Sequence, residues 1–162
     1  MKSSISLLFL VVLLSISCNN NNTKTLDFKT FTIEVPKGWN PVRENGIDSQ
    51  VGRIAIDEQD TLSFDLGWYS NSLSEEYSND YDRPGVEKLL KNTNTFETID
   101  NKKAKIVTPK KLGIGTTGIY FDRLWNAGSS VDRFQLNGHN LKPKNEKLLL
   151  KALRTIKFFQ KK

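Results

Sequence analysis

Apolar and polar residues alternate along several short segments of this chain. At residues 31–35 the alternation places Phe31, Ile33 and Val35 on one side of the segment. A repeat of two residues is typical of a β-strand with one face on the core. Residues 61–69 show the same repeat most clearly, with Leu62, Phe64, Leu66 and Trp68 on one side. The pattern predicts further strands at residues 51–56, 104–107, 117–125 and 131–136.

The segments between these strands carry turn and helix signals. Pro84 favours the start of a helix through Leu90, and Pro143 favours a second helix through Ile156. A last short strand is predicted at residues 157–159. Consecutive strands with two helices predict an α+β fold, in which helices cover an antiparallel β-sheet. Turn residues predict turns at residues 36–39, 57–60, 100–101 and 137–138, and a long polar loop at residues 71–85.

The N-terminus has a different pattern, an almost unbroken apolar run from Ile5 to Ile16 that follows Lys2. As a helix this run reaches about 18 Å, which is short for a hydrocarbon core of about 30 Å. A positive start, a short apolar run and small residues before a cleavage point are typical of a secretory signal peptide. We therefore predict a signal peptide at residues 1–17, with cleavage between Ser17 and Cys18.

Cys18 is the chain's only cysteine, and it stands where the apolar run stops. The segment resembles a bacterial lipoprotein signal, which implies a diacylglyceryl group and acyl chains such as palmitate on Cys18. Ser15 departs from the leucine usual at that position of the motif. Because Ser15 and Ser17 also suit ordinary signal peptidase, a secreted protein with a free thiol stays open, as does a membrane-embedded N-terminus.

Residues 18–25 are predicted to be the lipidated cysteine and a flexible tether, because four asparagines bury no apolar surface. Asn19 is not aspartate, and an acidic run after the cysteine is missing. By resemblance to enterobacterial lipoproteins, these features imply the periplasmic face of the outer membrane. Residues 26–160 are the size of one globular domain. No internal disulfide is possible, so apolar burial must hold that domain together.

Charge is distributed unevenly along the chain. Residues 18–100 contain 8 basic and 15 acidic residues, whereas residues 101–162 contain 15 basic and 3 acidic ones. One interpretation is that strands from the two halves neutralise each other within one sheet. The other is a basic surface at Lys144, Lys147 and Lys151 that meets anionic lipid headgroups or an acidic envelope protein. The predicted compartment argues against a nucleic-acid partner.

Two segments resemble PsbP-like domains. Phe31-Thr-Ile-Glu-Val-Pro-Lys-Gly-Trp39 is similar to their opening strand and turn, and Leu148-Leu-Leu-Lys-Ala-Leu-Arg-Thr-Ile-Lys-Phe158 to their closing helix and strand. The resemblance covers about residues 26–159 and implies a PsbP-like α/β sandwich around one antiparallel sheet. It implies no shared catalytic residue, and a fold by itself does not define a function.

Two motifs could indicate an enzyme. The glycines of residues 113–118 match the dinucleotide-binding pattern G-x-G-x-x-G, which works between a strand and a helix. Here a predicted strand follows, so we interpret the segment as a flexible hairpin loop. His139 is the only histidine, and it lacks the G-x-S-x-G motif of a serine hydrolase. We interpret it as a turn residue, with a hydrolase as an alternative.

Acidic residues and aromatics are the remaining candidates. Residues 80–85 resemble a calcium loop, but Lys91 stands where the loop needs glutamate, so no metal site is predicted. Asp57, Glu58 and Asp60 are interpreted as turn residues without a further role. Five aromatics could line a ligand pocket, although aromatics in strands usually belong to the core. They are Trp39, Trp68, Tyr69, Tyr120 and Trp125.

The sequence therefore predicts a membrane-anchored envelope lipoprotein, a non-enzymatic accessory or binding module that needs no cofactor. A small-ligand carrier with an aromatic pocket is the first alternative. A cavity of several hundred Å³ beside Trp68 would favour the carrier. A hydrolase is the second alternative, and a serine or aspartate hydrogen-bonded to His139 would favour it.

Overall fold

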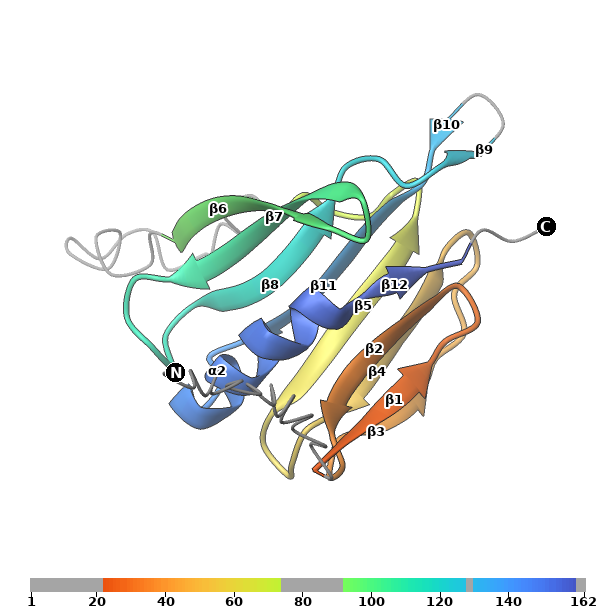
Figure 1. Cartoon of the computed structure of the whole chain (residues 1–162). Coiled ribbons are helices and arrows are strands. Elements are labelled where there is room, and N and C mark those ends of the chain that lie inside the picture. The colour runs from red at the N-terminus through yellow and green to blue at the C-terminus, as the bar shows by residue number, and fades with distance from the viewer. Residues whose placement is uncertain (1–21, 74–91, 128–129, 160–162) are drawn as a thin grey trace, which may run out of the picture.

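The computed structural model describes residues 22–73, 92–127 and 130–159. Within them the chain forms three antiparallel β-sheets, one α-helix and one 3₁₀ turn (Figure 1). The helix is α2 (Pro143–Ala152), and the 3₁₀ turn η1 (Leu153–Thr155) follows it directly. The strands are β1 (Thr23–Asp27), β2 (Phe31–Pro36), β3 (Asn40–Arg43), β4 (Gln50–Ala55), β5 (Thr61–Gly67), β6 (Asn92–Ile99), β7 (Lys102–Pro109), β8 (Thr116–Phe121), β9 (Asn126–Ala127), β10 (Ser130–Val131), β11 (Arg133–His139) and β12 (Lys157–Phe158).

The largest sheet has seven strands in the order β3-β4-β5-β11-β8-β7-β6. The two runs β3-β4-β5 and β6-β7-β8 each pair in sequence order. Strand β11 lies between β5 and β8 and joins the two runs. Strands β9 and β10 form a separate two-stranded sheet.

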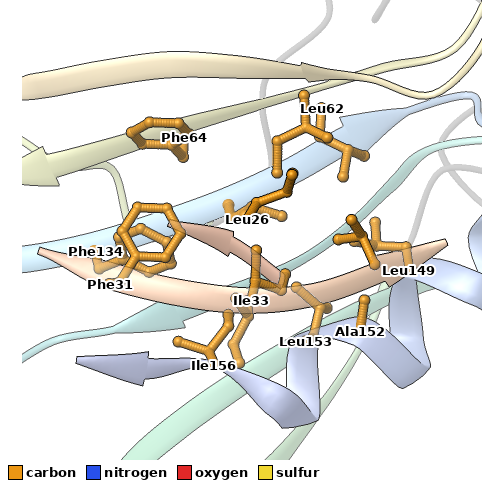
Figure 2. Packing of buried hydrophobic residues seen from close by; sticks show 14 of the residues in the cluster. Leu26, Phe31, Ile33, Leu62, Phe64, Phe134, Leu149, Ala152, Leu153 and Ile156 are labelled. Carbon is orange, nitrogen blue, oxygen red and sulfur yellow. The ribbon is translucent and has the colours of Figure 1, made fainter. Parts of the chain in front are cut away.

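One face of the large sheet is covered by the three-stranded sheet β1-β2-β12 and by α2 (Figure 1). Side chains from the three parts meet in one core (Figure 2). Phe31 of β2 is fully buried, with its ring centroid 4.8 Å from that of Phe134 and 5.1 Å from that of Phe64. Leu149 and Leu153 close the core from the helix side. Apolar contact between the layers therefore holds the domain together.

The predicted α+β fold, a sheet covered by helices, is wrong. The cover consists mainly of a second sheet, and the described residues contain a single short helix. Three strands that the alternation did not predict, β1, β3 and β6, account for much of the difference. The predicted helix from Pro84 to Leu90 lies outside the described residues, as does most of the loop predicted at 71–85.

Several local predictions are confirmed. Strands at residues 31–35, 51–56 and 104–107 agree with β2, β4 and β7 to within two residues at each end, and the helix begins at Pro143 as expected. The Asp100–Asn101 turn is also confirmed, since both residues have positive φ values, 49° and 57°.

Other local predictions differ from the structure. Asn137 and Gly138 lie within β11 and pair with both neighbouring strands, so they do not form a turn. Strand β5 ends at Gly67, and Trp68 beyond it is 52% exposed, so it does not continue the core face. Residues 23–25 were expected in the tether, but they pair with β2 in the register Thr23↔Pro36.

Candidate functional site

A shallow hollow of about 100 Å³ lies on the β6-β7-β8 part of the large sheet. Phe96, Lys105 and Tyr120 are direct neighbours across the three strands. They alternate with the buried residues Ala104, Ile106, Ile119 and Phe121 of the core. Because side chains of a strand point alternately to its two faces, the hollow lies on the face opposite the core. Its lining residues are Phe96, Lys103, Lys105, Tyr120 and Asp122.

The hairpin between β6 and β7 sets the register of the hollow. Its two-residue turn, Asp100–Asn101, has positive φ at both positions, as in turns that match the twist of a hairpin. Lys102 of β7 therefore pairs with Ile99 of β6. From this pair on, every second residue of each strand lies on the same face of the sheet. This register places Lys105 opposite Phe96.

The two lysines of the hollow lie over aromatic rings. Lys103 Nζ is 4.8 Å from the centroid of the Phe96 ring, and Lys105 Nζ is 5.5 Å from that of Tyr120. Both distances are within the range of cation–π attraction, which holds the ammonium groups above the hollow. Phe96 itself is 61% exposed, so the ring offers apolar area to a partner as well.

Burial and nearby charges change the acidity of two groups here. Partial burial lowers the pKa of Lys105, because the charged form loses hydration. Burial also raises the pKa of the Tyr120 hydroxyl, and Arg133 and Asp122 act on it in opposite directions. A carboxylate that enters the hollow would stabilise the ammonium form of Lys105 and offset its desolvation.

The size and composition of the hollow define what it can hold. Pockets for complete small ligands occupy about 300–1,000 Å³, several times more than this volume. A single side chain fits the space better than a complete ligand. Two lysines in the hollow and Arg133 nearby outweigh the one carboxylate of Asp122, so an acidic side chain is the best match.

The predicted basic surface lies elsewhere. Lys144, Lys147 and Lys151 are all exposed on α2, which covers the core face of the sheet. None of the three pairs with an acidic residue of the described part of the chain. Ser17, Cys18 and the residues 80–85 of the calcium-loop resemblance lie outside the described residues.

The five candidate aromatics do not form one pocket. Trp39 is buried in the core, and Trp125 packs against the core and donates a 2.7 Å hydrogen bond to Asp132. Trp68 and Tyr69 are 52% and 69% exposed, with ring centroids 5.1 Å apart. Because both rings project to the surface, they do not enclose the cavity that a carrier requires. Only Tyr120 belongs to the hollow.

His139 stands at the end of β11 and not in a turn. Its Nδ1 atom lies 3.2 Å from the Thr116 hydroxyl, and no serine or aspartate of the described residues is hydrogen-bonded to its ring. The arrangement expected of a hydrolase is therefore not formed by these residues.

A strand and not a helix follows the glycine-rich loop, as the sequence predicted, but β8 already begins at Thr116 within the motif, and the loop before it is not free. Gly113 donates its backbone N–H to Glu146 Oε2 at 2.9 Å, and Gly115 donates to Asn140 Oδ1 at 2.7 Å. These bonds hold the loop against α2 and the segment before it. The interpretation as a flexible loop is thus wrong. The glycines allow the backbone of this loop to follow a tight path.

The turn at residues 57–60 has a structural role that the sequence analysis missed. Asp60 Oδ2 accepts hydrogen bonds from the Lys142 backbone at 2.8 Å and from Asn145 Nδ2 at 2.7 Å. Asp57 Oδ2 accepts a second bond from Asn145 at 2.9 Å and faces Lys142 Nζ at 3.2 Å. The turn therefore fixes the start of α2, which has no side-chain cap of its own.

Sequence reasoning also missed most of the hollow. The alternation of Lys103 and Lys105 with Ala104 and Ile106 was a usable signal, because it directs both lysines away from the core. Phe96 had no such signal, since the residues around it are polar and exposed.

The described residues show neither a metal-binding cluster nor a membrane-spanning helix. They contain no cluster of three or more residues suited to bind a metal ion. None of their helices combines the length and hydropathy needed to cross a membrane.

Comparison with known proteins adds no family assignment. No protein-family model matches the chain, and no curated protein sequence matches it significantly.

Proposed function

We propose that this protein is a lipoprotein of the cell envelope, anchored through Cys18, that acts as a non-enzymatic binding module. The hollow on β6-β7-β8 is the observation that carries the binding role. It takes an acidic side chain of a partner protein between Lys103 and Lys105, while the exposed ring of Phe96 covers the apolar stem of that side chain.

The anchor rests on the sequence. Cys18 ends the apolar run, and strand β1 begins five residues later, at Thr23. A lipidated Cys18 would keep the domain within a short distance of the bilayer. Each buried CH₂ contributes about 0.8 kcal/mol, so two or more acyl chains give stable attachment. We place the protein on the periplasmic face of the outer membrane, and its resemblance to PsbP-like domains stays a prediction.

The two alternatives have less support. A carrier would need a larger enclosed space than the hollow, and Trp68 does not provide it. A hydrolase would need a serine or aspartate hydrogen-bonded to His139, whereas the ring lies beside the Thr116 hydroxyl. A binding module needs only a surface hollow of suitable charge, such as the one on β6-β7-β8.

Photo-crosslinking in cells tests the binding role. A crosslinking amino acid at position 96 should capture one identified envelope protein through an acidic segment. Lys103→Glu combined with Lys105→Glu should abolish the capture, because two repulsive charges would then meet the acidic side chain.

Charge reversal on the helix provides the matched control. Lys144→Glu, Lys147→Glu and Lys151→Glu together change more charge, but they lie on the other side of the sheet, so capture at position 96 should persist. Capture that ignores the changes at Lys103 and Lys105, or that disappears only with the helix variant, would contradict the role of the hollow.

A further inference from the structure

The register of the strands defines one edge of the molecule at which the described chain begins. Thr23 of β1 is paired with Pro36, the last residue of β2. The same edge holds the linked ends of the large sheet, as the pairs Asn40↔Ala55, Ala55↔Thr61 and His139↔Thr116 show. We call this the entry edge.

The start of α2 and the loop before β8 also lie at the entry edge (Figure 1). Hydrogen bonds from Lys142 and Asn145 to the turn at residues 57–60 fix the helix start there. The bond from Gly113 to Glu146 brings the loop of residues 110–115 against the first turn of the helix. Residues far apart in the sequence are thereby collected on one surface.

This surface is basic. Lys110 and Lys111 in the loop and Lys144 and Lys147 on the helix are exposed, and none of them forms an ion pair within the described part of the chain. Leu112, next to the two loop lysines, is 47% exposed.

The acidic residues of the entry edge are mostly engaged inside the protein. Asp57 and Asp60 accept bonds from Lys142 and Asn145, and Glu146 is buried and accepts the bond from Gly113. Asp57 is itself exposed but faces Lys142, and Glu58 is exposed as well. The field that reaches solvent from this edge is therefore positive.

The opposite edge has a different character. It carries Ile47, which is 99% exposed, and the exposed rings of Trp68 and Tyr69. Its charges are mixed, with Asp100 and Lys102 3.6 Å apart as one pair. Apolar exposure alone would make this edge a candidate for membrane contact, so the choice between the two edges depends on charge and on where the chain enters.

We propose that the entry edge docks on anionic lipid headgroups of the membrane that holds the anchor. Lys110, Lys111, Lys144 and Lys147 face the lipid phosphates, and Leu112 inserts at the interface. This inference rests on the proposed function, because it needs an acylated Cys18. Four residues lie between Cys18 and Thr23, and the five extended steps from one to the other span only about 18 Å.

The short span decides which edge meets the bilayer. Thr23 belongs to the entry edge, so this edge is the part of the domain nearest the anchor. Positively charged residues held near a bilayer are attracted to its negative surface over about one Debye length, roughly 10 Å. In this orientation Trp68, Tyr69 and Ile47 point away from the membrane.

An environment-sensitive fluorophore tests the orientation. Cys18 is the only cysteine of the chain and would be acylated, so Leu112→Cys gives a single labelling site, and Ile47→Cys gives a matched site at the opposite edge. The full-length protein, purified after processing, is reconstituted into vesicles with or without phosphatidylglycerol in phosphatidylcholine. The expected result is a blue shift and loss of quenching by neutral acrylamide at position 112 in anionic vesicles only, and no change at position 47.

Charge variants separate docking from mere proximity. Lys110→Glu with Lys111→Glu should restore quenching at position 112, whereas Lys29→Glu with Lys157→Glu, which makes the same charge change at the opposite edge, should not. The same preparation is checked by intact mass for acylation of Cys18. An unacylated protein overturns both proposals. An acylated protein that remains quenched at position 112, or that is protected at position 47 instead, overturns the docking proposal and leaves the anchor intact.

Discussion

Asn145 is a polar side chain that joins two elements of the fold through hydrogen bonds. It is 8% exposed, and its amide donates to Asp60 at 2.7 Å and to Asp57 at 2.9 Å. It thus links the β4–β5 turn to the first turn of α2. Helix starts normally gain such partners from a residue before the helix, but Lys142 supplies no side-chain cap.

Replacing Asn145 with alanine should lower the free energy of unfolding by about 1–3 kcal/mol, because a buried Asp60 oxygen loses a donor. Urea denaturation followed by tryptophan fluorescence measures the change. Lys144→Ala is the control one residue away, and it should stay within about 0.5 kcal/mol because Lys144 is exposed. Equal effects of the two substitutions would contradict this role for Asn145.

Asp57 should make stability dependent on pH in the acid range. Backbone N–H groups of Gln59 and Asp60, then Asn145 and Lys142, hold the pKa of its carboxyl well below the ordinary value of 3.8. A lowered folded-state pKa means that the carboxylate stabilises the fold above about pH 4, and that this contribution is lost as the pH falls further.

Asp57→Asn should therefore flatten the loss of stability between about pH 4 and pH 2, since an amide keeps the shape but does not titrate. Urea midpoints at several pH values provide the comparison. Glu58→Gln, the neighbouring exposed carboxyl, is the control and should leave the acid profile unchanged. An unchanged profile for the Asp57 variant would show that the hydrogen bonds of Asp57 do not make the stability depend on pH.

At the scale of elements, the pairing of two strands explains the last glycine of the motif, Gly118. It lies in β8, and a Cβ atom there would come within 2.6 Å of the Cβ of Asn137 and of the Leu136 carbonyl oxygen on β11. The close approach of two central strands requires glycine at this position. A nucleotide is not needed to explain it.

Gly118→Ala should destabilise the protein by about 1–3 kcal/mol, because a tightly packed strand pair must separate. Gly38→Ala is the matched control, since a Cβ there would have no atom within 4 Å. Thermal unfolding of both variants checks the prediction, and equal melting temperatures would count against it.

The sequence predicted the inner strands better than the outer ones. Strands β2 and β5 have one face on the core and one face towards polar surroundings, so their residues alternate. Strands β1, β3 and β6 stand at sheet edges. All four residues of β3 are exposed, and seven of the eight residues of β6 are not buried, so neither shows an apolar repeat.

The hollow could be predicted only in part. The lysines of β7 alternate with core residues and are therefore expected on the outer face. Their contact with Phe96 and Tyr120 depends on the pairing of three strands, which the Asp100–Asn101 turn fixes. A periodic pattern reports which face a residue occupies and does not report its neighbour across the sheet.

At the scale of the whole molecule, the large sheet has a core face and an outer face that carries the hollow. Strands β1, β2 and β12 with helix α2 enclose the core, while the hollow lies on the other side of the large sheet. The basic residues of the C-terminal half lie on two separate surfaces of the molecule. Lysines of the C-terminal half contribute to the hollow through β7, and to the entry edge through the loop before β8 and through α2.

Both proposed contacts, with a protein at the hollow and with lipid at the entry edge, depend on where the chain is attached. An anchor at Cys18 limits the rotation of the domain, because only four residues lie between Cys18 and the start of strand β1 at Thr23. The same domain without the anchor would present both surfaces in every direction. The modification of Cys18 is therefore the central claim.

Intact-mass spectrometry of the native protein, extracted from the membrane fraction, tests this claim most directly. We predict a chain that begins at Cys18 and carries a diacylglyceryl group with additional acyl mass, and we expect Cys18→Ser to abolish this product. A chain that begins at Met1, or one that carries a free thiol at Cys18, would contradict it.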